Sequence, residues 1–159
     1  MSVRVAVTGG RDHSDRAAVF AALDLLHARR TISAIMHGAC AGRDGVLRGA
    51  DRWADEWAIA NGFEPIRFPA DWNRFDRAAG PIRNEQILAE GRPDVVVAFR
   101  GGDGTAGMCL LAYRAGVPVI GAVRRNDGTI GFDRLKLDTP AAADRAGSGY
   151  PRGRERVGE

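Results

Sequence analysis

The chain has 159 residues, of which 45% are hydrophobic and 27% are charged, as in an ordinary soluble domain with one core. Its net charge of +3 is a small excess of 23 basic over 20 acidic residues, which argues against a nucleic-acid-binding surface. No apolar run approaches the roughly 20 residues of a membrane span, and the first residues lack the order of a signal peptide, so we expect a cytoplasmic location with no membrane partner.

Strand-like and helix-like segments alternate along the chain. Short, nearly unbroken apolar runs predict strands over residues 3–8, 32–37, 63–68, 94–99 and 117–123. Apolar residues at helical spacing, with their start signals, predict helices that begin at or near Ser14, Ala50, Pro81 and Thr105. Single helices between strands imply right-handed crossovers, so the pattern predicts an α/β fold with a mostly parallel sheet of about five strands and helices on both faces.

The predicted domain covers residues 1–123. In the following segment, 124–138, Asn126-Asp127-Gly128 favours a turn, and residues 129–132 are a candidate edge strand or extension of the turn. From residue 139 to residue 159, Ala, Gly, Arg and Pro dominate and no apolar period survives. That composition predicts a disordered tail.

Three glycine-rich or polar segments follow predicted parallel strands: 8–11, 37–51 and 100–105. In an open parallel sheet, ligands bind outside the carboxyl ends of the strands, so the three segments could face one crevice. In the third segment, glycines let the backbone approach a ligand, and the helix expected to open at Thr105 favours an anion at its N-terminus. The alternative is an ordinary tight turn with Thr105 as the helix cap.

Five motifs then occur in order along the chain. They are Thr8-Gly9-Gly10-Arg11-Asp12, Gly49-Ala50-Asp51 with Trp57-Ala58, Phe68-Pro69-Ala70-Asp71-Trp72, Ala79-Gly80-Pro81-Ile82-Arg83-Asn84 and Ala98-Phe99-Arg100-Gly101-Gly102-Asp103-Gly104-Thr105. Over roughly residues 3 to 122 the chain resembles the YspA/YpsA-related branch of the SLOG superfamily. That superfamily includes LOG-type phosphoribohydrolases, molybdenum-cofactor carrier proteins and the DNA-processing protein A domain. The resemblance implies a Rossmann-like fold.

The resemblance also implies nucleotide binding on the glycine-rich loops. The positions concerned are Gly9, Gly10, Gly101, Gly102, Gly104 and Thr105. In the LOG enzymes the last loop reads Pro-Gly-Gly-x-Gly-Thr-x-x-Glu, whereas here Arg100 replaces the Pro and Met108 replaces the catalytic Glu. A methionine side chain cannot accept a proton, so the sequence does not support hydrolysis by the LOG mechanism.

Several polar side chains near the loops are further candidates. Arg83 can hold a phosphate or carboxylate in a bidentate manner, and Asn84 can hydrogen-bond a base or ribose edge. Trp72 could stack on a base, and Asp71 could supply a carboxylate, although a loop-anchoring Trp with a capping Asp is an equal alternative. Asp51 could bond ribose hydroxyls, or cap its helix instead.

Asp44 is, with Asp71, one of two candidates for a replacement catalytic acid. Asp44 and Asp51 might together hold Mg²⁺ through water, because hard oxygen ligands suit that ion, so Mg²⁺ is a possible cofactor. The complete set of predicted ligand-binding residues is Thr8, Gly9, Gly10, Arg11, Gly38, Asp51, Trp72, Arg83, Asn84, Arg100, Gly101, Gly102, Gly104 and Thr105.

The first functional hypothesis is a sensor or binding domain for a nucleotide or nucleotide-derived ligand. The alternative is an N-glycosidase that releases the base from a nucleoside monophosphate. A weaker alternative is single-stranded DNA binding, against which the small net charge argues. The two widely spaced cysteines predict free thiols. A homodimer or larger homo-oligomer is expected, through the Trp53–Trp57 helix or the Ile87–Leu88 helix.

Overall fold

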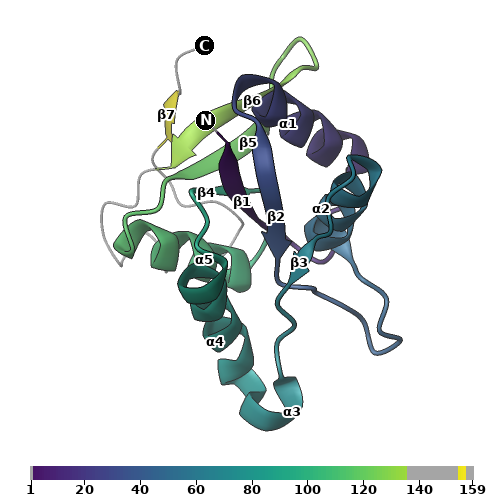
Figure 1. The fold of residues 1–159 in the computed structure, drawn as a ribbon, viewed down its shortest axis with the longest axis vertical. Coiled ribbons are helices and arrows are strands. Elements are labelled where there is room, and N and C mark those ends of the chain that lie inside the picture. Colours follow the sequence, from purple (N-terminus) through teal and green to yellow (C-terminus); the bar gives the residue numbers. More distant parts are fainter. Residues whose placement is uncertain (1, 136–153, 157–159) are drawn as a thin grey trace.

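A computed structural model describes residues 2–135 and 154–156, and it confirms the α/β fold (Figure 1). One sheet has seven strands in the order β3-β2-β1-β4-β5-β6-β7. The first five strands in that order run parallel, whereas β6 pairs antiparallel with β5 and β7 pairs antiparallel with β6. The strands are β1 Val3–Thr8, β2 Ile32–His37, β3 Ile66–Arg67, β4 Val95–Ala98, β5 Val119–Arg124, β6 Ile130–Leu135 and β7 Arg154–Arg156.

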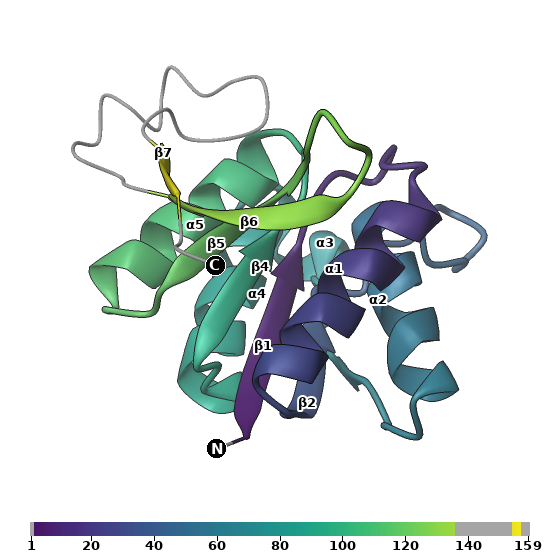
Figure 2. The same ribbon diagram turned by 90° about the horizontal axis from the view of Figure 1, so that it is seen from above.

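Helices cover both faces of the sheet, as the alternation of elements predicted. They are α1 Arg16–Arg29, α2 Gly49–Ala60, α3 Trp72–Phe75, α4 Ala79–Gln86 and α5 Asp103–Arg114. Two short segments adjoin α4: the 3₁₀ turn η1 Asp76–Ala78 and the π-helical segment η2 Ile87–Gly91. In the view from above, α1 and α2 lie on one side of the sheet and α4 and α5 on the other (Figure 2). None of the helices in the described ranges is both long and apolar enough to cross a bilayer.

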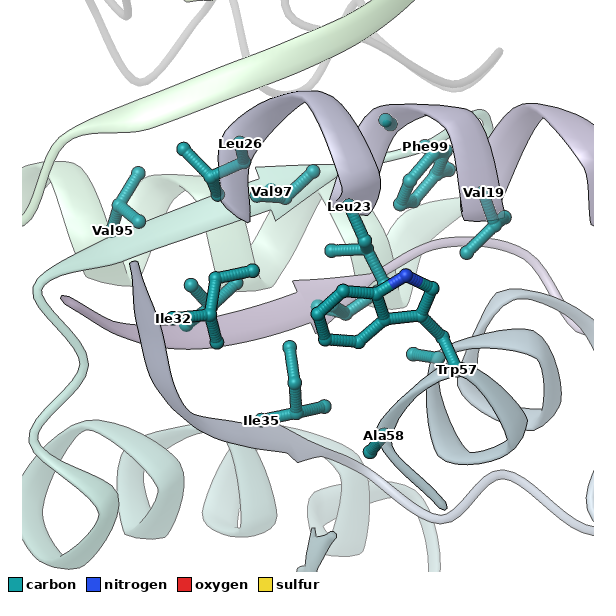
Figure 3. Packing of buried hydrophobic residues seen from close by; sticks show 14 of the residues in the cluster. Val19, Leu23, Leu26, Ile32, Ile35, Trp57, Ala58, Val95, Val97 and Phe99 are labelled. Atoms are coloured by element: carbon teal, nitrogen blue, oxygen red, sulfur yellow. The ribbon is translucent and has the colours of Figure 1, made fainter. Parts of the chain in front are cut away.

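Two hydrophobic clusters pack the sheet between these helix layers. Alternate side chains of β1 point to opposite faces, so Val5 and Val7 join the cluster under α1 and α2, whereas Ala6 joins the cluster under α5. Figure 3 shows the first cluster, in which Trp57 lies among Leu23, Ile35 and other buried side chains. The Trp57 indole N–H donates to the Asp24 carboxylate at 2.8 Å, so the ring is buried without leaving its donor unpaired.

The ends of several elements differ from the prediction. Asp15, not Ser14, caps α1, because its carboxylate accepts the Ala18 N–H at 2.9 Å. The third strand is reduced to Ile66–Arg67, and the segment between the predicted strand 63–68 and the helix predicted to begin near Pro81 contains α3, η1 and the start of α4. This segment has few apolar residues to form a periodic face, which is why its helical turns escaped prediction.

The described strands after residue 123, β6 and β7, belong to the same sheet. Asn126-Asp127-Gly128 makes the predicted turn, and Gly128 adopts a φ of 85° there. β6 is longer than the predicted edge strand and lies between β5 and β7, and its Phe132 packs in the core. Of the tail predicted to be disordered, Arg154–Arg156 form β7, and residues 139–153 and 157–159 lie outside the described residues.

Candidate functional site

A cleft of about 1040 Å³ opens at the carboxyl ends of the parallel strands. Its walls come from the loops that follow β1, β2 and β4, together with parts of the helices α2, α3, α4 and α5. β1 lies between β2 and β4, so the strand order reverses direction at this point. Ligands of open α/β sheets bind at such a reversal, because the loops on the two sides diverge and leave a crevice.

The structure brings all the predicted ligand-binding residues together at this cleft. Its lining contains Thr8, Gly9, Gly10, Arg11, Gly38, Asp51, Trp72, Arg83, Asn84, Arg100, Gly101, Gly102, Gly104 and Thr105. The lining also contains residues outside the predicted ligand-binding set, which are Val7, Asp12, His13, Ser14, Asp15, Cys40, Ile87 and Met108. Of these, residues 12–15 directly follow the first glycine-rich loop, so their position in the chain was a usable signal.

The β1 loop is fixed by backbone contacts with two other elements. The Gly10 N–H donates to the Arg100 carbonyl at 2.8 Å, and the Gly10 carbonyl accepts the Ala50 N–H at 3.2 Å. Gly49 has a φ of 64°, and a Cβ built on it would lie 2.0 Å from the Gly10 carbonyl oxygen. A side chain at Gly49 would therefore push apart the loops after β1 and β2.

The start of α5 presents unpaired backbone donors to the cleft. The helix begins at Asp103 with Gly102 as its cap, two residues earlier than the predicted opening at Thr105. The Thr105 side chain is buried against Gly101 and makes no capping bond. In the described part of the chain, the N–H groups of residues 103–105 donate to no other group. These donors and the helix dipole favour a negative charge at this end of the cleft.

The glycines of this loop differ in how much room the surrounding atoms leave for a side chain. A Cβ on Gly101 would lie 2.1 Å from the Thr105 hydroxyl and 2.7 Å from the Gly10 nitrogen, so packing requires that glycine. A Cβ on Gly102 or Gly104 would meet nothing within 4 Å. Packing within the described residues therefore does not explain the glycines at these two positions, whereas close approach of a ligand would.

Three arginines add positive charge to the cleft. Arg11 and Arg100 have exposed side chains and form no ion pair within the described residues. Arg83 is partly buried and donates through Nη1 to the Gly38 carbonyl and through Nε to the Asn84 side chain at 2.9 Å. Asn84 in turn donates to the Gly104 carbonyl at 3.3 Å, which connects α4 to α5. The guanidinium group of Arg83 is thus held in place before any ligand binds.

Side chains from other elements hold the backbone of residues 38–40, which line the cleft after β2. The Ala39 N–H donates to His37 Nδ1 at 3.0 Å, and the Cys40 N–H donates to Asp51 Oδ2 at 2.9 Å. Ala39 has a φ of 50°, an unusual conformation for a residue with a side chain. Strain of this kind persists only where the surroundings hold it, and it gathers at functional sites.

Behind this turn lies a buried network that the sequence reading missed. His37 Nε2 lies 2.8 Å from Asp55 Oδ2, and Arg67 donates to both Asp55 oxygens at 2.7 and 3.0 Å. Because His37 Nδ1 accepts from Ala39, Nε2 carries the proton that Asp55 accepts. Burial would raise the pKa of Asp55, but the bonds from Arg67 and His37 outweigh it and hold that pKa below its usual value.

Neither predicted replacement acid lines the cleft. Asp44 is exposed and pairs with Arg48 at 3.0 Å, while Asp71 caps α3 through the Arg74 N–H at 3.1 Å. Asp51 does line the cleft but does not cap α2, since the cap position is Arg48. The cleft thus does not bring Asp44 and Asp51 together as Mg²⁺ ligands. Within residues 2–135 and 154–156, no three acidic, Cys or His side chains are placed to hold a metal.

Two aromatic side chains border the cleft. Trp72 is 54% exposed, and its ring lies over Gly80 of α4. His13 packs edge-on against Phe99, and burial lowers the pKa of its imidazole. Its Nδ1 is the one fully buried side-chain nitrogen or oxygen of the described residues that has no hydrogen-bond partner.

Both cysteines are free, and their surroundings predict different reactivities. Cys109 is buried under the sheet, and burial raises the pKa of its thiol to about 12, so it holds no thiolate near neutral pH. Cys40 is partly exposed at the cleft. Iodoacetamide at pH 8 should label Cys40 and leave Cys109 unmodified, as peptide mass spectrometry would show. Rapid native-state labelling of Cys109, or equal labelling in a Cys40→Ser variant, would contradict this prediction.

A parallel sheet with a glycine-lined cleft at the reversal of its strand order defines a Rossmann-like α/β protein. Residues 3–75 match the model of the YspA, cpYpsA-related SLOG family, which supports the resemblance of the chain to this branch of the SLOG superfamily. No curated protein matches the chain. This match suggests nucleotide-related binding or a glycosidase-like activity.

Proposed function

We propose that the cleft binds a nucleotide or nucleotide-derived ligand, as a sensor or binding domain, with a phosphate at the start of α5. The single observation that carries this proposal is the pair Gly102 and Gly104. Each leaves open space where a side chain would fit, beside backbone N–H groups without partners in the described residues. Asp103, in the same turn, does not line the cleft, so its carboxylate does not occupy the anion position.

The rest of the cleft suits the remainder of such a ligand. Arg100 and Arg11 can neutralise phosphate charge, and Arg83 offers a fork already oriented by Gly38 and Asn84. Trp72 exposes half of its ring at the border of the cleft, where it can stack on a base.

Nucleoside monophosphate N-glycosidase activity is the alternative. Met108 stands at the position of the LOG-type catalytic Glu and is buried at the cleft, so it supplies no carboxylate there. Three other carboxylates support this alternative, because Asp12, Asp15 and Asp51 line the cleft. Release of free base from a nucleoside monophosphate, lost on replacing one of these acids, would support hydrolysis over binding alone.

A Gly104→Val substitution tests the phosphate site directly. We expect AMP, GMP, CMP, ADP-ribose, NAD or ATP at about a hundred times its dissociation constant to stabilise the wild-type protein by about 2.7 kcal/mol, seen as a raised midpoint of thermal unfolding. In Gly104→Val the branched side chain would occupy the space beside the donors and abolish that shift. The protein should still fold, since no atom lies within 4 Å of the added Cβ.

Gly104→Ala serves as the matched control for folding. Alanine stabilises a helix relative to glycine by up to about 1 kcal/mol, so this variant should melt no earlier than wild type while it binds more weakly. If Gly104→Val kept the full ligand shift, the phosphate would lie elsewhere. If no nucleotide and no free phosphate shifted the wild-type midpoint, with or without Mg²⁺, the proposed function would be wrong.

Single-stranded DNA binding has less support. The cleft holds only three lining arginines, and binding through several phosphates needs a longer basic track. The expected homo-oligomer stays a prediction. Trp57 and Ile87 are buried in the core, so an interface over their helices would have to use exposed side chains such as Ile59 and Ile82.

A further inference from the structure

Asp51 forms part of the cleft wall on the side of α2, away from the start of α5. Asp51 is the third residue of α2, and it is only 5% exposed although it lines the cleft. The loop after β1, with Gly9 and Gly10, lies between this wall and α5, because β1 separates β2 from β4 in the sheet. A ligand with its phosphate at α5 would therefore extend across the glycines toward Asp51.

The other acids of the cleft differ from Asp51 in their partners. Asp15 caps α1 and pairs with Arg124 at 2.8 Å, and Asp12 is exposed to solvent. Asp51 forms no ion pair within the described residues. Its Oδ2 accepts the Cys40 N–H, and no group of the described chain donates to its Oδ1. Asp51 Oδ1 is therefore free to hydrogen-bond a ligand in the cleft.

The surroundings of Asp51 restrict what that group can bind. A second anionic group beside a buried carboxylate would be repelled, so the phosphate of the ligand is not the partner of Asp51. Burial raises the pKa of Asp51, against the opposing effects of His37, Cys40 and Arg83, which favours the protonated form. A hydroxyl group both donates and accepts hydrogen bonds, so it can pair with the carboxyl group in either protonation state.

We propose that Asp51 is a specificity-determining residue that hydrogen-bonds a sugar hydroxyl of the ligand. This inference rests on the proposed phosphate site and narrows its ligand to a phosphate ester of a hydroxyl-bearing sugar. A ligand that lacks the hydroxyl leaves Asp51 without its partner, and this loss lowers the affinity for deoxy analogues.

The test uses probes that carry no base. Binding of inorganic phosphate, ribose 5-phosphate, 2-deoxyribose 5-phosphate and 3-deoxyribose 5-phosphate is measured by titration calorimetry on the full chain. Wild type should bind ribose 5-phosphate roughly tenfold more tightly than one of the deoxy analogues, the value of one hydrogen bond. In Asp51→Ala this preference should nearly disappear, so that ribose 5-phosphate and the deoxy analogue bind with similar affinity. Asp51→Asn, whose amide can still bond both Cys40 and a hydroxyl, should retain part of it.

The ratio between probes separates recognition from structural damage, because a distorted cleft weakens all sugar phosphates alike. Equal binding of the three sugar phosphates to wild type would overturn the inference while leaving the phosphate site standing, and this comparison needs no variant. An unchanged preference in Asp51→Ala would also overturn it. If no probe, including inorganic phosphate, bound to wild type, the proposed function itself would fail and the inference with it.

Discussion

Replacing Gly49 by alanine is expected to lower the free energy of unfolding by about 3 kcal/mol and to abolish ligand binding. Two costs combine at this position. The φ of 64° is unfavourable for any residue with a Cβ, and that Cβ would lie 2.0 Å from the Gly10 carbonyl oxygen and 2.6 Å from the Arg11 Cα. Relief would require the β1 loop to move away from α2, which would displace the backbone that lines the cleft. Chemical denaturation and the nucleotide thermal-shift panel measure the two effects.

Gly45→Ala is the matched control for Gly49→Ala. Gly45 lies in the loop that precedes Gly49 and has a φ of 75°, but nothing lies within 4 Å of a Cβ built on it. Its replacement should therefore cost only the backbone strain, about 1 kcal/mol, and should leave ligand binding intact. If both variants lost the same stability, the contact between Gly49 and Gly10 would have no structural importance.

An Asp55→Ala substitution should lower the free energy of unfolding by about 3 kcal/mol, because removing one member of a buried charged network leaves its partners unpaired. His37 is fully buried and would lose the acceptor for its Nε2 proton. Arg67 is about half exposed, so water would replace much of its lost interaction with Asp55. The expected loss of stability, about 3 kcal/mol, therefore lies at the low end for buried charged networks. Urea denaturation at pH 7 provides the measurement.

The same network predicts a pH dependence for the wild-type protein. Since the folded state lowers the pKa of Asp55, its contribution is fully present above the unfolded value of about 3.9 and is lost as the pH falls through the folded value. The stability difference between wild type and Asp55→Ala should therefore shrink below about pH 4.

Asp44→Ala provides a surface control for Asp55→Ala. Its ion pair with Arg48 and the hydrogen bond that it accepts from the Val46 N–H are both exposed, so water replaces the lost contacts and the denaturation midpoint should change little. An equal loss in the two variants would show that burial of the network contributes nothing. Disruption of the network should also weaken binding, because His37 Nδ1 holds the Ala39 N–H at the cleft.

How far the sequence could predict the site depended on the kind of interaction. Gly9, Gly10 and Gly101 were found because glycine pairs or runs directly after apolar strands are a local signal, and the cleft contains them all. Asp55 was missed although it follows Asp51 by four residues on the same face of α2, a spacing that could have drawn attention to it. Its partners His37 and Arg67 come from two separate strands, and no local pattern connects them.

The chain by itself determined the alternation of elements, the buried parallel strands and the edge at which the polar loops gather. These features follow from the spacing of apolar residues and the positions of glycines, which are signals contained within a few neighbouring residues. Only the tertiary structure decided that Asp51 lines the cleft while Asp44 pairs outward with Arg48, and that α5 opens at Asp103 instead of Thr105. Such outcomes depend on which loops meet across the sheet, because burial and the loss of water around a carboxylate arise only when distant segments pack together.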